Sequence, residues 1–553
     1  MSAAKGKRPH ASRHVPHHGP HHAPRHDARA REGGATTRWT RWIAYAAIAL
    51  FGIYWLVQGF SAHGIGNYGV ETDFYWKYGP AARDLARGHV DAQYYDSKGW
   101  GYPAAVALLA LSGFEPFRAG QVIALLAALV SLLLLYRLHR SLFGPGAALA
   151  GVLLVAGNGV FLANTYEVGT DMFFLAVALA SVALLLRSKE PGALAVLASG
   201  LLGGWAFSTR YNGLFLLPGA LALFLVYRVP QGPMGAAWRR AAIWTGGFVA
   251  GALPWLVINA VHTGNPLTNS NYVNVGYAVY GEGNWEKFFY GGGRSVHSFA
   301  DVVLLDPGRF VVAMVKNVFD HVRRDLFELL SPPWGAAAIG GALLLLKDRP
   351  DRRVLGYLTF GALGFLSLVP VFYGARFSLP LLPFYAALVT WPLVSPTAGR
   401  ALAGLERAFP LRSFVFLLLW VPIAFSAYVW TGDSANPEAV RIGPYDLTQA
   451  IGFLKQRATP GEGLLARKPH AAFLADLRFV PIPDVANSDS LHAVAERERA
   501  RYLLVSGAEL SLRAAIRPFA APDAAIPGFT RIFESPGALV YEVVPIAPKP
   551  DRP

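Results

Sequence analysis

Residues 119–136 read AGQVIALLAALVSLLLLY, a segment without one charged side chain. As a helix it can cross the hydrocarbon core of a bilayer, which takes about 17 to 25 apolar residues. Arg137 and Arg140 follow at once, and such basic residues are typical of the cytoplasmic end of a membrane span. The segment therefore predicts a transmembrane helix with a defined direction.

Apolar segments of this kind recur along most of the 553-residue chain. With 53% hydrophobic and only 15% charged residues, the composition excludes an ordinary soluble globule. Because open sheets leave backbone groups unsatisfied in lipid, the membrane part must be helical. We predict an all-α polytopic domain with about eleven spans. Their expected positions are 42–60, 119–136, 145–163, 169–186, 193–208, 213–227, 241–261, 329–346, 354–373, 377–394 and 413–430.

The short loops rich in Lys and Arg all fall on one side of this arrangement, which the positive-inside rule identifies as the cytoplasm. We therefore expect a cytoplasmic N-terminus and two large extracytoplasmic loops, 61–118 and 262–328. The net charge of +15 lies largely in the tail and the cytoplasmic loops. Topology thus explains it, and no nucleic-acid partner is expected.

The two ends of the chain differ from the membrane domain, which we place at 41–431. Residues 1–40 are rich in His, Arg and Pro and predict a disordered cytoplasmic tail. Residues 440–548 alternate helical and β-like segments, such as RYLLVSG at 501–507, and predict a small extracytoplasmic α/β domain. The absence of Cys excludes disulfides and thiolate metal sites. Abundant Ala, Gly, Arg and Pro suggest a bacterium with a GC-rich genome, hence the bacterial inner membrane.

Four carboxylates occupy the predicted outer face. Glu71 and Asp73 lie in GVETDFYW at 69–76, where an extended backbone would project both from one face. The alternative is that Thr72 or Asp73 caps the helix that follows. Glu167 and Asp171 are four residues apart at the mouth of a span, a spacing that places them on one side of a helix.

Three cations on the same face are exceptions to the cytoplasmic bias of Lys and Arg. Lys98 lies in QYYDSKGWGYP, Arg210 in AFSTRYNGLFLLP and Arg376 in PVFYGARFSLPLLPFY. An arginine at such a depth is costly unless it is paired, and its planar fork suits a phosphate. The arginines therefore either pair with Glu167 or Asp171, or they bind a phosphorylated substrate delivered from the membrane.

The order of four motifs, E-T-D, T-D-M, S-T-R-Y-N-G-L and A-R-F-S-L-P-L-L-P-F, resembles the multispan glycosyltransferases of the GT-C type. The nearest group contains protein O-mannosyltransferases and bacterial aminoarabinose transferases. This resemblance implies a polyprenyl-phosphate-linked sugar as donor and Asp73 as catalytic base, with Glu71 completing the E-x-D pattern. It also implies that Asp171 lines the same cavity.

The resemblance extends to the phosphate-binding residues. Arg376 matches a late R-[YF]-x-x-P turn and Arg210 a basic position in the S-T-R turn, so both are expected at the donor phosphate. Lys98 stands where relatives carry Lys or His before Pro-Pro, a motif that KGWGYP replaces here. The remaining residues expected to line the substrate cavity are Glu167, Tyr102, Tyr211 and Asn212.

We therefore expect transfer of a sugar to an acceptor hydroxyl on the extracytoplasmic face, with inversion at the anomeric carbon. The acceptor is an unknown glycan, lipid or protein. No cofactor is required by this chemistry, although a divalent ion bridged by Glu71, Asp73 and Asp171 is an alternative. Competing functions are a lipid or polysaccharide transporter, a polymer ligase that uses the same charged cavity, and a non-enzymatic scaffold.

A basic turn, Arg467, Lys468 and His470, stands out in the C-terminal domain. It could hold an acceptor or a lipid phosphate. We expect instead an ordinary exposed turn, because charged residues of small domains are mostly on the surface.

Overall fold

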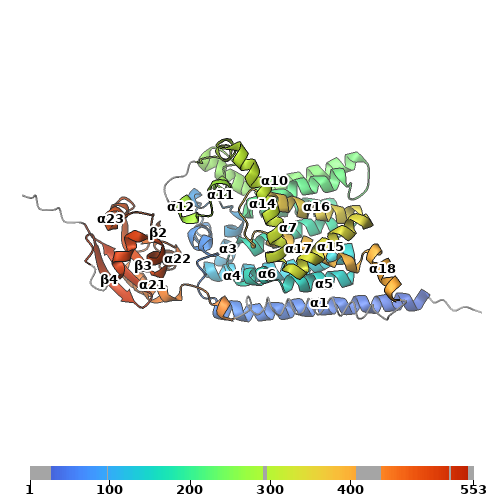
Figure 1. Cartoon of the computed structure of the whole chain (residues 1–553), viewed down its shortest axis with the longest axis horizontal. Coiled ribbons are helices and arrows are strands. Elements are labelled where there is room, and N and C mark those ends of the chain that lie inside the picture. Colours follow the sequence, from blue (N-terminus) through green and yellow to red (C-terminus); the bar gives the residue numbers. More distant parts are fainter. Residues whose placement is uncertain (1–25, 96–97, 291–295, 407–436, 522–524, 546–553) are drawn as a thin grey trace, which may run out of the picture.

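The computed structural model describes residues 26–95, 98–290, 296–406, 437–521 and 525–545. Figure 1 shows a bundle of helices, with α1 along one side, and a separate α/β domain at one end of the bundle. This arrangement confirms the predicted fold class, a helical membrane protein with a small C-terminal α/β domain. The functional residues discussed below lie at the end of the bundle nearest that domain.

The helices of the bundle follow the expected apolar segments. The main ones are α1 His26–Ala62, α4 Pro116–Phe143, α5 Pro145–Ala156, α6 Gly159–Tyr166, α7 Thr170–Leu186, α8 Ala193–Thr209, α9 Leu216–Leu221, α10 Met234–Thr263, α15 Pro332–Asp348, α16 Arg352–Leu368, α17 Leu382–Thr390 and α18 Pro396–Glu406. The shorter elements between them include α2 Gly79–Ala86, α3 Gly101–Ala110, α11 Tyr272–Tyr280, α12 Trp285–Tyr290, α13 Phe299–Leu304 and α14 Pro307–Arg324.

Fewer helices than expected are long and apolar enough to cross a membrane by themselves. Within the described residues there are 4 such helical segments, or 5 if the pair α5 and α6, bent by 63°, is one span. They are Arg38–Ala62, Pro116–Phe143, Met234–Thr263 and Leu379–Ala401. Other expected spans are shorter apolar helices, such as α7 and α8 of 17 residues each, so the count of eleven is not confirmed. The chain is nevertheless a multi-pass membrane protein by the length and composition of its helices.

Two further expectations concern the chain ends. Helix α1 begins at His26, so residues 26–40 are helical rather than part of a disordered tail. Ala and Arg, both good helix formers, are frequent in this stretch and extend the membrane helix toward the N-terminus. The expected disorder of residues 1–25 and the expected span at 413–430 lie outside the described residues.

Glycines allow α8 and α10 to pack very closely. A Cβ on Gly204 would lie 2.0 Å from the Phe248 carbonyl oxygen, and one on Gly251 would lie 2.2 Å from the Leu201 carbonyl oxygen. Such small-residue contacts are a common way for membrane helices to associate, because they let the backbones approach. The contact fixes α8, whose last turn carries Thr209 directly before Arg210.

The C-terminal domain contains a five-stranded sheet with the order β2-β1-β3-β5-β4. Its strands are β1 Gly463–Ala466, β2 Arg478–Pro481, β3 Ala500–Ser506, β4 Phe529–Ser535 and β5 Ala538–Val543. Strand β1 pairs in parallel with β2 and β3, whereas β5 is antiparallel to both β3 and β4. Strand β2 lies on one side of β1 and β3 on the other, so the strand order reverses between β1 and β3. The segments that follow these two strands are therefore neighbours at the carboxyl edge of the sheet.

Candidate active site

The first outer loop is helical where an extended segment was expected. Asp73 has helical backbone angles, φ −62° and ψ −31°, and stands directly before a π-helical turn, Phe74–Tyr78, that continues into α2. Residues two apart on a helix point in different directions, so Glu71 and Asp73 do not share a face. The Asp73 side chain makes no capping hydrogen bond either. Capping therefore does not account for Asp73.

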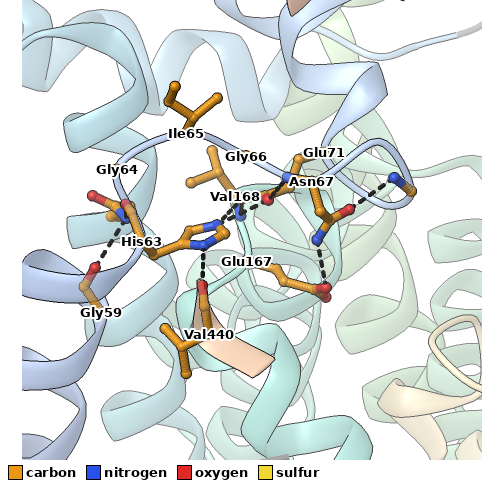
Figure 2. Close-up of polar contacts among 12 residues, drawn as sticks. Gly59, His63, Gly64, Ile65, Gly66, Asn67, Glu71, Glu167, Val168 and Val440 are labelled. Atoms are coloured by element: carbon orange, nitrogen blue, oxygen red, sulfur yellow. Dashed lines mark hydrogen bonds and ion pairs between the residues drawn. The ribbon is translucent and has the colours of Figure 1, made fainter. Parts of the chain in front are cut away.

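Glu71 is fully buried in a polar network, shown in Figure 2. Its carboxylate accepts hydrogen bonds from His63 Nε2 at 2.9 Å, from the Asn67 backbone N–H at 2.6 Å and from the Val168 N–H at 2.7 Å. These donors come from two different loops. Glu71 thus ties the first outer loop to the turn between α6 and α7, and it is closed off from solvent.

His63 carries a positive charge in this network. Its Nδ1 donates to the Val440 carbonyl oxygen at 2.7 Å while Nε2 donates to Glu71, and both ring nitrogens donate only in the imidazolium form. Burial alone would lower the pKa of His63, but the Glu71 carboxylate raises it above the ordinary value. The first loop therefore contains a buried ion pair that spacing within the sequence does not reveal.

Asp73 lies in a different environment, with 31% of its side chain exposed. Lys98 donates to its Oδ2 at 2.7 Å. Burial would raise the pKa of Asp73, but the charges of Lys98, Arg376 and Arg210 hold it below its usual value. Asp73 is therefore an ionised, reachable carboxylate beside several cations.

The two arginines flank one aromatic ring at the same site. Arg210 donates to Asp171 and, at 3.2 Å, to the Thr170 hydroxyl. The guanidinium carbon of Arg210 is 5.4 Å from the centre of the Phe377 ring, and that of Arg376 is 5.0 Å from it. Of the two alternatives for Arg210, pairing with Asp171 is the one found.

Arg376 differs from Arg210 in its partners. Within the described part of the chain its side chain forms no hydrogen bond or ion pair, although the charges of Asp171, Asp73 and Glu167 act on it. A guanidinium held among carboxylates but bonded to none of them retains its full set of donors. Arg376 thus has donors available for an anion such as a phosphate.

Glu167 completes the acidic side of the site. Its Oε1 accepts from the Asn67 side-chain amide at 2.9 Å. Burial, together with the negative charge of Glu71, raises the pKa of Glu167 to about 7. This carboxyl group therefore takes up a proton at a much higher pH than an ordinary glutamate.

The expected aromatic and amide residues are packed against other parts of the protein. Tyr102 is fully buried in α3 and packs against Tyr78 and Phe173, since the helix turns its ring inward. The Tyr211 ring packs at a tilt of 59° against Trp255, and its hydroxyl donates to the Thr268 carbonyl oxygen. Asn212 is half-buried in the same turn. Tyr102 in particular is a core residue.

The suggested divalent-ion site is not found either. Among the described residues no group of three or more His, Asp and Glu side chains could hold a metal ion. The three proposed ligands are separated by their partners: His63 binds Glu71, Lys98 binds Asp73, and Arg210 binds Asp171.

The basic turn of the C-terminal domain is an interface and not an exposed turn. His470 is fully buried, and its Nε2 donates to the Asn67 carbonyl oxygen at 3.0 Å. Arg467 pairs with Glu286 of α12 at 2.8 Å. The sequence marked these residues as basic, but it gave no signal that another domain covers them.

Comparison with known proteins bears on the fold. Residues 104–257 match the family model described as dolichyl-phosphate-mannose-protein mannosyltransferase. No protein of curated function matches the sequence.

Several solved structures share the fold. ArnT from Cupriavidus metallidurans, bound to undecaprenyl phosphate, aligns over 90% of this chain and 98% of its own, with 15% identity and a TM-score of 0.52. The oligosaccharyltransferase AglB from Archaeoglobus fulgidus, in complex with an inhibitory peptide and a dolichol-phosphate, aligns over 91% and 74%, with 12% identity and a TM-score of 0.56. The arabinofuranosyltransferase AftD from Mycobacteria aligns over 90% and 40%, with 13% identity and a TM-score of 0.50. The chain therefore has the fold of the GT-C membrane glycosyltransferases, as its sequence motifs predict.

Proposed function

We propose that this protein transfers a sugar from a polyprenyl-phosphate donor to an acceptor hydroxyl, with Asp73 as general base. The observation that carries the proposal is the pairing of one reachable carboxylate with a cluster of cations. Asp73 is 31% exposed and contacts Lys98, and the charges of Arg210 and Arg376 act on it. A base for the acceptor and cations for the departing phosphate are what such a transfer needs.

The roles of the residues follow from the bonds that change. The acceptor oxygen forms a bond to the anomeric carbon while the bond from that carbon to the phosphate oxygen breaks. The hydroxyl proton passes to Asp73, and polyprenyl phosphate leaves with the electron pair of the broken bond. Because the attack is direct and in line, the anomeric configuration inverts.

The three cations have different roles in this mechanism. Arg376 retains its donors and binds the phosphate of the donor. Arg210 is held by Asp171 and Thr170, so it supplies fixed positive charge beside that phosphate without reorganisation. Lys98 keeps Asp73 ionised and can turn toward the phosphate as negative charge develops there.

The donor class rests on two supports. Two structures of the same fold are complexes with lipid carriers, undecaprenyl phosphate in one and dolichol-phosphate in the other. The site lies at the end of the bundle that carries the α/β domain, which is the extracytoplasmic end according to the distribution of Lys and Arg. We propose that the protein acts at the outer face of a bacterial inner membrane, on a lipid-linked sugar.

The test is sugar transfer by the purified full-length chain in proteoliposomes. A panel of radiolabelled polyprenyl-phosphate monosaccharides is supplied, and release of polyprenyl phosphate is measured with and without a membrane extract as acceptor source. Transfer with an inverted product, established by NMR, supports the proposal. A retained configuration contradicts the role of Asp73, and uptake of intact lipid-linked sugar without cleavage indicates a transporter.

A further inference from the structure

The segment that carries the proposed base is held by both domains, and the contacts from the C-terminal portion have no role in the mechanism so far. We define residues 62–73 as the base loop. Among the described residues of the C-terminal portion, Val440, Tyr445, Lys468 and His470 form hydrogen bonds with it. The base loop therefore depends on residues that follow it by more than 350 positions in the sequence.

Two of these contacts fix the beginning of the base loop. The Tyr445 hydroxyl donates to the Ala62 carbonyl oxygen at 3.0 Å and accepts from the Gly64 N–H at 2.8 Å. The Val440 carbonyl oxygen accepts from His63, which in turn donates to Glu71 (Figure 2). Val440 and Tyr445, which precede the first strand of the α/β domain, thus complete the buried network around His63 and Glu71.

The other two contacts come from the turn after β1 and reach the end of the base loop. His470 donates to the Asn67 carbonyl oxygen, and the Asn67 side chain holds Glu167. Lys468 Nζ donates to the Tyr68 carbonyl oxygen at 3.0 Å and to the Thr72 hydroxyl at 3.3 Å. Thr72 immediately precedes Asp73.

The location of this turn in the sheet is informative. It follows β1, next to the segment after β3, where the strand order reverses. In open α/β sheets the crevice at this point is where ligands bind. Here the base loop enters it, since the Tyr68 ring packs edge-on against His470 at 4.9 Å. The α/β domain therefore contacts the base loop of the membrane domain through the turn that follows β1.

Lys468 has unusual surroundings for a largely buried ammonium. Both of its hydrogen-bond acceptors are neutral oxygens, and the described residues provide it with no ion pair. Burial and the neighbouring charge of Arg467 lower its pKa, while the charge of Asp73 opposes that change. Its location is thus unfavourable for stability and is explained by what it does to the residue before Asp73.

We propose that Lys468 is a positioning residue for the reaction, which fixes the turn before Asp73 and so sets the place of its carboxylate relative to donor and acceptor. This inference rests on the proposed function of Asp73. Displacing a reacting group by about 1 Å can cost about 100-fold in rate. The α/β domain then contributes to the active site by positioning the proposed base.

The experiment compares Lys468→Met with Lys468→Arg and with a matched control, Lys455→Met, in the full-length protein. Lys455 is an exposed lysine of the same domain. We expect Lys468→Met to lower kcat about 10- to 100-fold, with the KM for the donor within about twofold of wild type. Lys468→Arg should recover most of the rate, and Lys455→Met should match wild type.

Hydrogen exchange of peptides covering the base loop provides a readout that needs no activity. Faster exchange in Lys468→Met than in Lys455→Met is the expected result. Equal exchange in the two variants, equal kcat, or a loss of rate that only follows the folded fraction overturns the inference. If wild type transfers no sugar from any donor while the exchange difference is present, the proposed function fails and the contact itself stands.

Discussion

Glu71 and Asp73 are one residue apart and belong to opposite sides of the first outer loop. Glu71 is fully buried and accepts three hydrogen bonds from His63, Asn67 and Val168. Asp73 is partly exposed, and Lys98 is its single hydrogen-bond donor among the described residues. Glu71, on the buried side, holds the loop in place, and Asp73, on the partly exposed side, can accept a proton from an acceptor.

The comparison shows that the partners of a carboxylate, and not its place in the E-x-D motif, determine its role. A buried carboxylate with all of its lone pairs occupied cannot accept a proton from a substrate without breaking the network around it. A carboxylate beside cations stays ionised and can accept one. Each prediction below separates the two sides of the loop by changing a residue on one of them.

The largest effect is expected for Asp73→Asn. The amide keeps the size of the side chain but cannot accept the acceptor's proton, so kcat should fall about 100- to 10,000-fold. The unfolding temperature should stay close to that of wild type, because no buried pair is broken. Transfer assays and thermal unfolding in detergent measure the two quantities, and a rate within tenfold of wild type would contradict the assignment of the base.

Glu71→Gln should act on stability. It leaves the His63 imidazolium buried without a counter-charge, and breaking a buried ion pair in this way costs about 3 to 5 kcal/mol. Denaturant unfolding measures the loss. The double variant with His63→Gln tests the cause, since removing both charges should restore part of the stability; strictly additive losses would show that the pair does not interact.

Arg376→Met should weaken use of the donor. Loss of a guanidinium that binds the phosphate is expected to lower kcat/KM for the polyprenyl-phosphate sugar about 10- to 100-fold. Arg441→Met is the matched control, because Arg441 is exposed outside the site. Equal donor kinetics in the two variants would remove Arg376 from the phosphate site.

Glu167→Gln should have the smallest effect, on the pH dependence of stability. The pKa of Glu167 is raised to about 7 in the folded protein, so below this pH the folded state binds a proton that the unfolded state releases. Wild type should therefore lose stability as the pH rises from about 5 to 7, by at most about 3 kcal/mol. The glutamine variant should lack this component. Unfolding temperatures of wild type and Glu167→Gln, measured from pH 5 to 8, test this prediction. Identical pH profiles for the two proteins would refute the raised pKa of Glu167.

The sequence predicted the fold class because apolar segments and basic loops are local signals. It also identified Asp73, Lys98, Asp171, Arg210 and Arg376, whose proximity at one end of the bundle follows from topology. It left both an extended segment and the start of a helix open around Glu71, since nothing local distinguishes the two there, and the structure shows the helix. It missed His63 because its partners, Glu71 and Val440, are brought together only by the packing of two domains.

The most direct test measures transfer by Asp73→Asn and Glu71→Gln together, in the same proteoliposomes, with rates expressed per folded molecule. We predict that Asp73→Asn is folded and at least about 100-fold slower than wild type. Glu71→Gln should be less stable, and the rate of its folded fraction should fall far less than that of Asp73→Asn, because Glu71 only holds the loop in place. The reverse pattern, an active Asp73→Asn and a stable but inactive Glu71→Gln, would contradict the division of roles between the two sides of the loop.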